Sequence, residues 1–244
     1  MGESAGRSEV FDRIAGQVLG FIQDHRLGPG DRLPSEREFA LRLNVSRPAL
    51  RESLATLEAM RVIARRPNAG IFVAGDGASP SFESMVLRGG LGLPLDPATV
   101  IQSLEVRNLL ELQAVDLACE RRTDENLAHL DAILASTRAR LREGGSIIDL
   151  DEAFHLGVVA ATGNPVFVQI VQAFYRLSKL RREVYFSDLG RCRRSHRQHT
   201  AILRAITARD RAAAREAMHA HIHEGLLRSL VEQPGAVRGD ASAP

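Results

Sequence analysis

The chain has 244 residues, of which 44% are hydrophobic and 25% are charged, and its formal net charge is +2. These values are ordinary for a soluble globular protein and leave room for two domains with separate cores. No apolar run approaches the roughly twenty residues that a membrane span needs, and the first ten residues lack a hydrophobic signal core. Two distant cysteines, Cys119 and Cys192, indicate free thiols in a reducing compartment. We therefore expect a cytoplasmic protein without a membrane segment.

The first part of the chain predicts a series of short helices. Apolar residues along Ser8 to His25 predict an amphipathic helix, and Gly28-Pro29-Gly30 ends it. Ser35 and Glu38 form a capping box, which predicts that a second helix begins directly after Ser35. Asn44 is suited to the left-handed conformation that stops a helix.

A third helix and a hairpin follow. Ser46 is its predicted cap, and Pro48 suits its first turn, where a missing N–H does no harm. Its leucines recur at helical spacing and are expected to face inward. The segments Val62 to Arg66 and Gly70 to Val73 flank a Pro-Asn-Ala-Gly turn and predict a β-hairpin. Helix, tight turn, helix and hairpin form the plan of a winged helix-turn-helix.

The start of the third helix carries residue types that suit duplex DNA. Ser46, Arg47 and Arg51 lie there, on the side that the leucines leave free. A helix fits the major groove, where arginine can hold guanine with two hydrogen bonds and serine can hold a phosphate. Eight arginines and four glutamates lie between Arg32 and Arg66, although arginine is abundant throughout this chain. The alternative is a solvated helical pair within an all-α protein.

Composition also divides the chain. A small, polar stretch follows Val73 and is the best linker in the sequence. We expect a winged helix-turn-helix domain over 1–74, a linker over 75–81, an all-helical domain over 82–233 and a flexible tail over 234–244.

The second domain is expected to be an antiparallel helical bundle. From Phe82 onward helix signals repeat without any strand signal, which predicts six or seven helices in a mainly α protein. One of these helices should begin at a capping box formed by Ser146 and Asp149. The family resemblance described below implies that this bundle binds the effector and supports dimerisation.

Four residues of the bundle have types and spacing that suit a metal. Asp151 and His155 are four residues apart, so both side chains leave one helix in the same direction. His199 and His221 belong to the last two predicted helices. Imidazoles and a carboxylate from three helices could converge on zinc or another transition metal. The alternative is separate histidines, one in the core and the others solvated.

Three further residues are candidates for effector binding. Arg107 and Glu111 are one turn apart near the edge of the apolar stripe of a long predicted helix. The guanidinium could face a cavity and hold a carboxylate with two hydrogen bonds, or the two side chains could form a surface ion pair of little energetic weight. Asn164 could face the same cavity, although it also suits the cap of a helix.

A strongly basic stretch runs from Arg176 to Arg197. It contains eight basic residues against Glu183 and Asp188. It could be a solvated rim, a second phosphate contact or the entrance for an anionic ligand. The sequence does not choose among these, and the solvated rim is the default interpretation.

A resemblance to a known family is carried by about thirty consecutive residues, from Pro29 to Glu58. They read PGDRLPSEREFALRLNVSRPALRESLATLE and resemble the DNA-binding domain of GntR-family transcriptional regulators. The resemblance implies DNA contacts by Arg37, Ser46, Arg47 and Arg51, and contact of the wing tip, which includes Asn68, with the minor groove. Two departures are Arg61, where relatives usually carry Gly, and a wing tip that is not Gly-rich.

A second resemblance covers the bundle. The segments DEAFHLGVVAATGNP, QHTAILRAI and AMHAHI resemble the FCD effector domain of FadR-type GntR regulators. Many such domains hold a divalent metal with one Asp and three His, and their effector is typically a small organic acid that binds the metal and an arginine. By position this implies the metal ligands Asp151, His155, His199 and His221, with Arg107 as the arginine.

Together these observations predict a transcriptional regulator that is not an enzyme. We expect a homodimeric repressor that binds a palindromic double-stranded DNA operator and responds to a small carboxylate effector. One alternative is a metal-sensing regulator, in which the metal itself is the signal. A metal-dependent enzyme is a further alternative, but the nearest acid, Glu152, points elsewhere on its helix.

Overall fold

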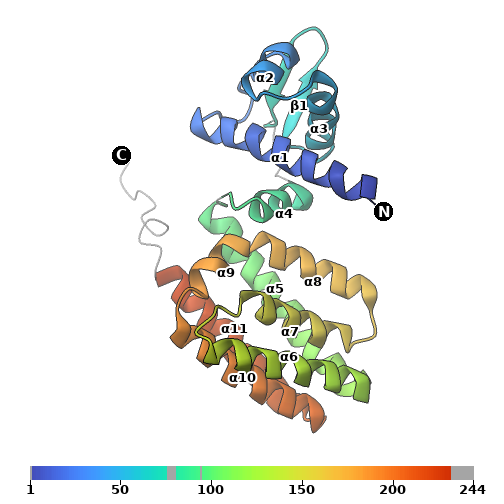
Figure 1. Ribbon diagram of the computed structural model, residues 1–244, viewed down its shortest axis with the longest axis vertical. Coiled ribbons are helices and arrows are strands. Elements are labelled where there is room, and N and C mark those ends of the chain that lie inside the picture. Colours follow the sequence, from blue (N-terminus) through green and yellow to red (C-terminus); the bar gives the residue numbers. More distant parts are fainter. Residues whose placement is uncertain (1, 76–80, 94, 232–244) are drawn as a thin grey trace, which may run out of the picture. The chain divides into compact units, whose positions relative to one another are not determined.

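The chain is described by a computed structural model that covers residues 2–75, 81–93 and 95–231. It divides into two compact units, Met1–Pro94 and Leu95–Pro244. Helices predominate in both units, and a two-stranded sheet belongs to the first (Figure 1). Within the described ranges, no helix is long and apolar enough to cross a membrane.

The first unit is a winged helix-turn-helix, as predicted. Its elements are α1 (Gly2–Asp24), α2 (Glu36–Arg42), α3 (Arg47–Ala59), β1 (Ile63–Arg66), β2 (Gly70–Val73) and α4 (Phe82–Gly90). Its core joins α1, α2, α3 and the hairpin, and its fully buried side chains include Ile14, Val18, Phe39, Leu50, Leu54 and Leu57. The inward orientation of the α3 leucines leaves the opposite side of that helix exposed.

Both predicted helix starts around the turn are confirmed. Ser35 is the N-cap of α2 and accepts a hydrogen bond from the backbone N–H of Glu38 at 3.3 Å. Ser46 is the N-cap of α3 and accepts from the backbone N–H of Ala49 at 3.4 Å. Between them Asn44 has φ +52°, the left-handed stop expected there. These local contacts fix the angle at which the chain enters α3.

The hairpin forms the wing. β1 and β2 pair antiparallel, with Ile63 opposite Val73 and Arg66 opposite Gly70. Asn68 (φ +58°) and Gly70 (φ +116°) make the tight turn in the left-handed region, which Asn and Gly tolerate best. Ile63 is buried against the helices, so the tip projects while the base is anchored.

Helix α4 belongs to the first unit. The Ser81 hydroxyl donates to the carbonyl of Met60 at 2.9 Å, and Leu87 and Leu91 pack against the core of the first unit. From the sequence we expect the second domain to begin at Phe82. The unit boundary at Pro94 differs because this amphipathic helix finds its apolar partners on the N-terminal side.

Arg61 occupies a backbone position that favours glycine. Its φ is +56°, its N–H donates to the carbonyl of Glu58, and the N–H of Val62 donates to the carbonyl of Leu57, both at 2.9 Å. This is the Schellman ending of a helix, in which the residue after the cap is left-handed. The departure from the glycine of GntR relatives therefore places a strained residue at the end of α3.

Arg61→Gly is expected to stabilise the first unit by about 1 kcal/mol, because glycine adopts the left-handed conformation without steric penalty. The midpoint of urea unfolding, followed by far-ultraviolet circular dichroism, should move upward. Arg13→Gly, at an exposed interior position of α1, is the control and should lower stability by a similar amount. Equal shifts for the two variants would contradict this account.

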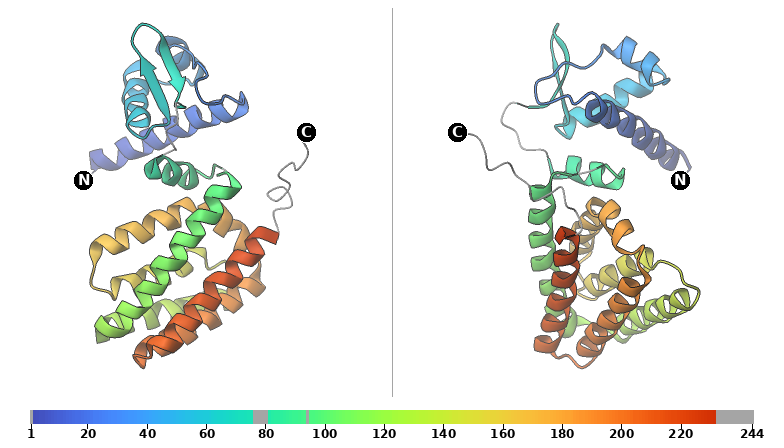
Figure 2. Two further views of the ribbon diagram at one scale, coloured as in Figure 1. Left: turned by 180° about the vertical axis from the view of Figure 1, so that it is seen from behind. Right: turned by 90° about the vertical axis from the view of Figure 1, so that its left-hand side faces the viewer.

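The second unit is a helical bundle. Its elements are α5 (Pro97–Arg121), α6 (Asp124–Arg142), α7 (Ile148–Ala160), α8 (Pro165–Leu177), α9 (Lys179–Tyr185), α10 (Leu189–Thr207) and α11 (Arg211–Val231). Helix α5 contacts α7, α8, α10 and α11, and Figure 2 shows α5 and α11 side by side. The buried core lies between these helices and includes Val115, Phe154, Val158 and Ile202.

Two details of the bundle differ from the sequence prediction. Helix α7 does not begin at a Ser146–Asp149 capping box: its N-cap is Ile147, which makes no side-chain cap bond. The buried Ile147 side chain anchors this end, and the Asp149 carboxylate instead accepts from Arg140 Nη1 at 3.5 Å. The short helix α9 was not predicted.

Two arginines fasten one end of the bundle. Arg122, after α5, donates to the carbonyls of Ile206 and Thr207 at the end of α10, at 3.1 and 2.5 Å. Arg209, after α10, donates to the carbonyls of Cys119 and Glu120 at the end of α5, at 2.8 and 2.6 Å. Each arginine thus satisfies the open carbonyls of the other helix.

Candidate functional site

A cluster of ligand-type side chains lies inside the bundle. Helix α7 carries Asp151 and His155 one turn apart, α10 carries His199, and α11 carries His221. One donor atom from each of the four lies within 4.8 Å of all the others. Asp151, His155 and His199 are buried to 3% exposure or less, whereas His221 is half-buried.

The imidazole nitrogens converge. The Nε2 atom of His221 lies 3.0 Å from Nε2 of His155 and 3.2 Å from Nε2 of His199. Asp151 Oδ1 is 3.4 Å from Nε2 of His199 and 3.9 Å from Nε2 of His155. Three imidazoles and one carboxylate thus face a common point from three helices.

Hydrogen bonds behind the cluster decide which nitrogens face it as acceptors. His155 Nδ1 lies 2.7 Å from Glu111 Oε2, and because a carboxylate only accepts, Nδ1 carries the proton. His221 Nδ1 lies 2.8 Å from Gln198 Oε1, which has the same effect. Two Nε2 lone pairs therefore face each other at 3.0 Å, an arrangement that a shared cation stabilises. The donor set fits a divalent transition metal.

Two of the histidines, His199 and His221, hold the protonation state that a metal requires. Burial lowers the pKa of His221 to about 3, and the neighbouring His155 adds to the effect. Burial also places the pKa of His199 well below its usual value. Burial raises the pKa of Asp151, but His155 and Arg182 outweigh it, so the pKa stays below its ordinary range. At neutral pH His199 and His221 are neutral imidazoles and Asp151 is a carboxylate, the forms that bind metals.

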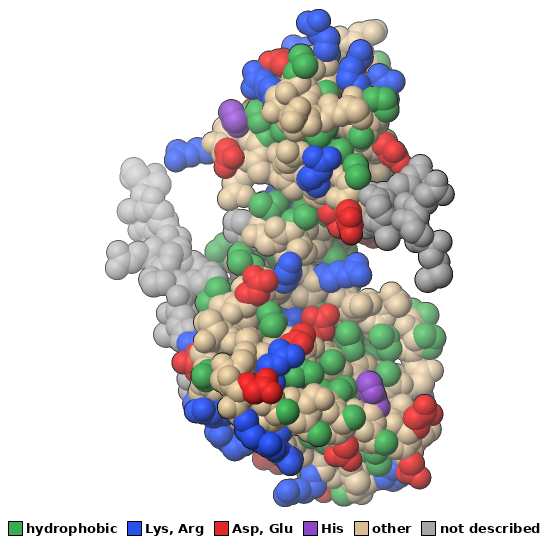
Figure 3. All heavy atoms as spheres, in the orientation of Figure 1, with side chains coloured by type: hydrophobic (Ala, Val, Ile, Leu, Met, Phe, Trp, Pro, Cys, Tyr) green, Lys and Arg blue, Asp and Glu red, His purple; other side chains and the backbone are tan. Residues whose placement is uncertain are grey.

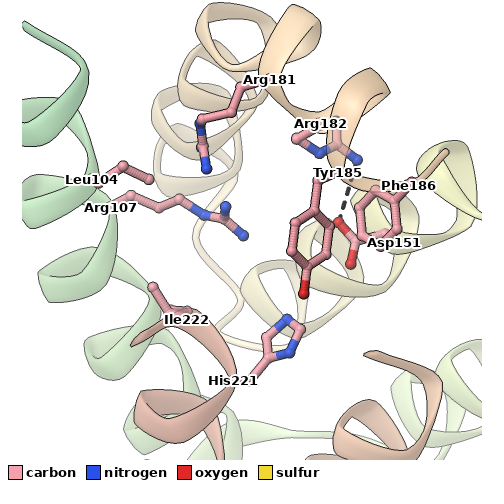
Figure 4. Close-up of a pocket in the computed structure, with 9 residues that line it drawn as sticks. All are labelled: Leu104, Arg107, Asp151, Arg181, Arg182, Tyr185, Phe186, His221 and Ile222. Carbon is pink, nitrogen blue, oxygen red and sulfur yellow. Dashed lines mark hydrogen bonds and ion pairs between the residues drawn. The ribbon is translucent and has the colours of Figure 1, made fainter. Parts of the chain in front are cut away.

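A small pocket opens beside the cluster. It has a volume of about 40 Å³ and is lined by Leu104, Arg107, Asp151, Arg181, Arg182, Tyr185, Phe186, His221 and Ile222. Arg107 from α5 and Arg181 from α9 reach toward the same space, with Asp151 and His221 across from them (Figure 4). A water needs about 10–15 Å³ on such a measure, so the pocket suits a ligand of few atoms.

The pocket is electropositive. Arg182 is buried and divides its charge between Asp151 (3.3 Å) and Glu152 (2.8 Å). Burial lowers the pKa of Arg181 to about 10, and the charges of Arg107 and Arg182 add to this effect. Guanidinium groups gathered in this way favour an anionic ligand.

The predicted DNA-contacting residues lie on the surface of the first unit. Arg37, Ser46, Arg47, Arg51 and Asn68 are all exposed, and Figure 3 shows basic side chains spread over the face of this unit. The Nε atom of Arg51 donates to Glu36 Oε2 at 3.0 Å, which joins that guanidinium to the first residue of α2. The start of α3 therefore offers positive charge and a serine hydroxyl to a ligand.

Each of the two units matches a known protein family. Residues 11–73 match the family described as bacterial regulatory proteins, gntR family, and residues 102–224, half of the chain, match the FCD domain. The chain belongs to the GntR family. It is a DNA-binding transcriptional regulator of the GntR type with an FCD domain, as the sequence resemblance implied.

Relatives of this GntR-family regulator carry regulatory names. The HTH-type transcriptional regulator LutR of Bacillus subtilis is 30% identical over 208 residues, covering 82% of this chain and 92% of LutR. The HTH-type transcriptional repressor NanR of Salmonella schwarzengrund is 28% identical over 223 residues, covering 89% and 83%. Such names accord with the expectation that the chain is not an enzyme.

A solved structure shares the fold. The structure of Lar, described as controlling expression of the Listeria monocytogenes agr system, has a TM-score of 0.68 and 18% sequence identity, and the match covers 93% of this chain and 97% of Lar. At this identity the likeness concerns the fold alone.

Of the three residues predicted to bind the effector in this GntR-family regulator, only Arg107 lines the pocket. Glu111 does not line the pocket: it is fully buried and contacts His155 and Tyr175. Asn164 is not part of the pocket lining, which corrects the expectation that it faces this cavity. Its side chain caps α8, accepting from the N–H groups of Val166 and Phe167, and is exposed.

Several residues in and behind the pocket were not recognised in the sequence. Arg181 and Arg182 belong to the basic stretch whose default interpretation was a solvated rim, yet Arg182 is buried and both line the pocket. Of the three interpretations considered, the ligand entrance fits these two residues best. Tyr175, whose hydroxyl donates to Glu111 at 2.9 Å, gave no signal in a helix of mostly apolar residues.

Proposed function

We propose that this protein is a repressor whose affinity for operator DNA changes when a small organic acid binds beside a divalent metal in the helical unit. The protein would act in the cytoplasm as a homodimer, with one α3 helix from each subunit on each half of a palindromic operator. The regulatory role of LutR and NanR supports the general class, and the pocket supports the kind of effector.

One observation carries the proposal: the pocket and the ligand cluster share residues. Asp151 and His221 belong to both, and guanidinium groups form the opposite side of the pocket. An acid in this space would meet the cluster at one end and Arg107 at the other. The volume of about 40 Å³ favours an acid of few carbons.

The residues have distinct roles in this proposal. Asp151, His155, His199 and His221 would hold zinc or another transition metal, which would supply positive charge and coordination positions for a carboxylate. Arg107 would orient the acid with two hydrogen bonds. On the DNA side, Arg47 and Arg51 would contact bases, whereas Arg37, Ser46 and Asn68 would contact phosphates or the minor groove.

Regulation requires that the acid bind two arrangements of the protein unequally. A ligand with equal affinity for the DNA-binding and the released arrangement would shift nothing. Coupling of this kind typically changes affinity by about 5- to 150-fold.

The proposal is tested with an operator selected from random double-stranded DNA by repeated rounds of binding. Fluorescence anisotropy would measure operator affinity with Zn²⁺ alone, L-lactate alone, acetate alone and each acid together with Zn²⁺. We expect an acid to weaken operator binding by about 5-fold or more only when Zn²⁺ is present. Arg107→Met should remove the response to acid.

Other outcomes would point elsewhere. If operator affinity changes with Zn²⁺ concentration and is unaffected by the acids, the metal-sensing alternative is favoured. Four protein ligands could complete a tetrahedral zinc site without an organic ligand, which is the observation behind this alternative. If neither Zn²⁺ nor the acids change operator affinity, effector control at this pocket is contradicted.

A further inference from the structure

We propose that Glu111 couples the anion pocket to the metal-ligand cluster, so that metal affinity and anion affinity depend on each other through this carboxylate. Glu111 lies on α5 between Arg107, which lines the pocket, and His155, which belongs to the cluster. This inference rests on the proposed function, since it assumes that the cluster holds a metal and the pocket an anion.

One carboxylate oxygen of Glu111 holds the cluster. Oε2 accepts the Nδ1–H of His155 at 2.7 Å, and both side chains have 0% exposure. Water therefore does not compete for this bond. A carboxylate behind a ligating imidazole fixes its tautomer and orientation and strengthens its other nitrogen as a donor.

The other oxygen holds the pocket side. Oε1 accepts from Arg107 Nε at 3.1 Å and from the Tyr175 hydroxyl at 2.9 Å. Arg107 Nη2 in turn donates to the Tyr175 oxygen at 2.6 Å, so the three side chains form a closed ring of hydrogen bonds. Arg107 is thus in contact with the pocket and with Glu111 at once.

The single negative charge of Glu111 is shared among Arg107, Tyr175 and His155. In a site closed to water, charges that share a partner affect each other strongly. An anion that binds the Arg107 guanidinium weakens the ion pair between Arg107 and Glu111. The Glu111 carboxylate then interacts more strongly with the Nδ1–H of His155, and Nε2 of His155 becomes a stronger metal ligand. By linkage, a bound metal must favour the anion to the same degree.

A purely structural role for Glu111 makes a different prediction. If the hydrogen bonds of Glu111 only fasten α5 to α7 and α8, then breaking them lowers stability without a specific effect on metal affinity. If Arg107 acts on the metal only through space, its effect does not need Glu111. A double-mutant cycle separates these cases.

The test measures Co²⁺ affinity of the full chain, without any added anion, by competition with a chelator. Glu111→Gln should weaken Co²⁺ binding by about 10- to 100-fold. Arg107→Met should tighten it, because Glu111 then loses its cationic competitor for His155 and keeps only the neutral Tyr175 hydroxyl beside it. In the Glu111→Gln background, Arg107→Met should have no effect. An Arg107→Met effect of equal or greater size in that background would overturn the proposal.

A milder variant keeps the test valid if Glu111→Gln does not fold, as judged by circular dichroism. Tyr175→Phe removes one hydrogen bond to Glu111 and preserves buried volume, and it should tighten Co²⁺ binding as Arg107→Met does. Unchanged affinity in Tyr175→Phe would count against the coupling. Glu120→Gln is the matched control on α5, since Glu120 is exposed and paired with Arg211, and it should bind Co²⁺ normally.

Failure of the inference and failure of the proposed function are distinguishable. A wild-type chain that binds no Co²⁺ would overturn both. A wild-type chain that binds Co²⁺ while Glu111→Gln binds it equally well would overturn the coupling alone.

Discussion

Replacing His221 by alanine is expected to lower the affinity of the protein for Zn²⁺ by more than the roughly 10- to 100-fold that loss of a supporting contact costs. His221 is the only donor that α11 contributes to the cluster found among the described residues, and its Nε2 contacts both other imidazoles. Isothermal titration calorimetry at fixed pH would measure the change.

The same variant should lose metal-dependent stability. A metal at a thousand times its dissociation constant adds about 4 kcal/mol to the free energy of unfolding of the protein that binds it. Wild-type protein should therefore melt at higher temperature with Zn²⁺, and His221→Ala should not. His219→Ala is a matched control, because His219 is exposed on the same helix and stacks on His223 instead. A control that behaves like His221→Ala would place the metal elsewhere.

Arg47→Ala is expected to weaken operator binding by about 1–3 kcal/mol, which corresponds to roughly 5- to 150-fold in affinity. Arg47 is the first residue of α3 and is exposed, so its guanidinium can reach base edges that the helix N-terminus meets first. The loss should be larger for the selected operator than for random DNA. Fluorescence anisotropy at constant salt would measure both affinities.

A charge-matched control separates base contact from general electrostatics. Arg204 is exposed on α10 in the helical unit, and Arg204→Ala removes the same charge from the chain. It should leave operator affinity nearly unchanged. If the two variants weaken the selected operator equally, then α3 is not the recognition helix, and the assignment of Arg37, Ser46, Arg51 and Asn68 would have to be reconsidered as well.

The first unit could be predicted in detail because its signals are local. The Ser35 and Ser46 caps each depend on a contact within three residues, and Asn44 stops α2 by its own backbone conformation. Asp151 and His155 could be paired for the same reason, since one helical turn separates them. Where the contacting residue lies nearby in the sequence, residue type and spacing are enough to predict the local structure.

The parts that escaped prediction depend on distant partners. Glu111 meets His155 and Tyr175 across sequence separations of 44 and 64 residues, so its role is invisible in the helix that carries it. The buried position of Arg182 depends on Asp151, 31 residues away. An arginine in a basic stretch is expected to be solvated. The ion pairs with Asp151 and Glu152 that accompany the burial of Arg182 are seen only in the folded bundle.

The boundary between the units shows the same limitation. Phe82 begins a helix whose direction of packing depends on whether its apolar side meets α1 or α5, and both choices suit its composition. The choice is made by Leu87 and Leu91, which fit against the core of the first unit. Asn164 illustrates the converse, because a good cap residue remained a cap.

The crossed carbonyl bonds of Arg122 and Arg209 give α5 the mechanical character of a lever. Its 25 residues span about 37 Å at 1.5 Å per residue, and its far end is held to α10 as by a pivot. Each degree of tilt about that pivot displaces Pro97 by about 0.6 Å. A tilt about this end would move Pro97 further than Arg107, because Pro97 begins α5 whereas Arg107 lies nearer to the pinned end.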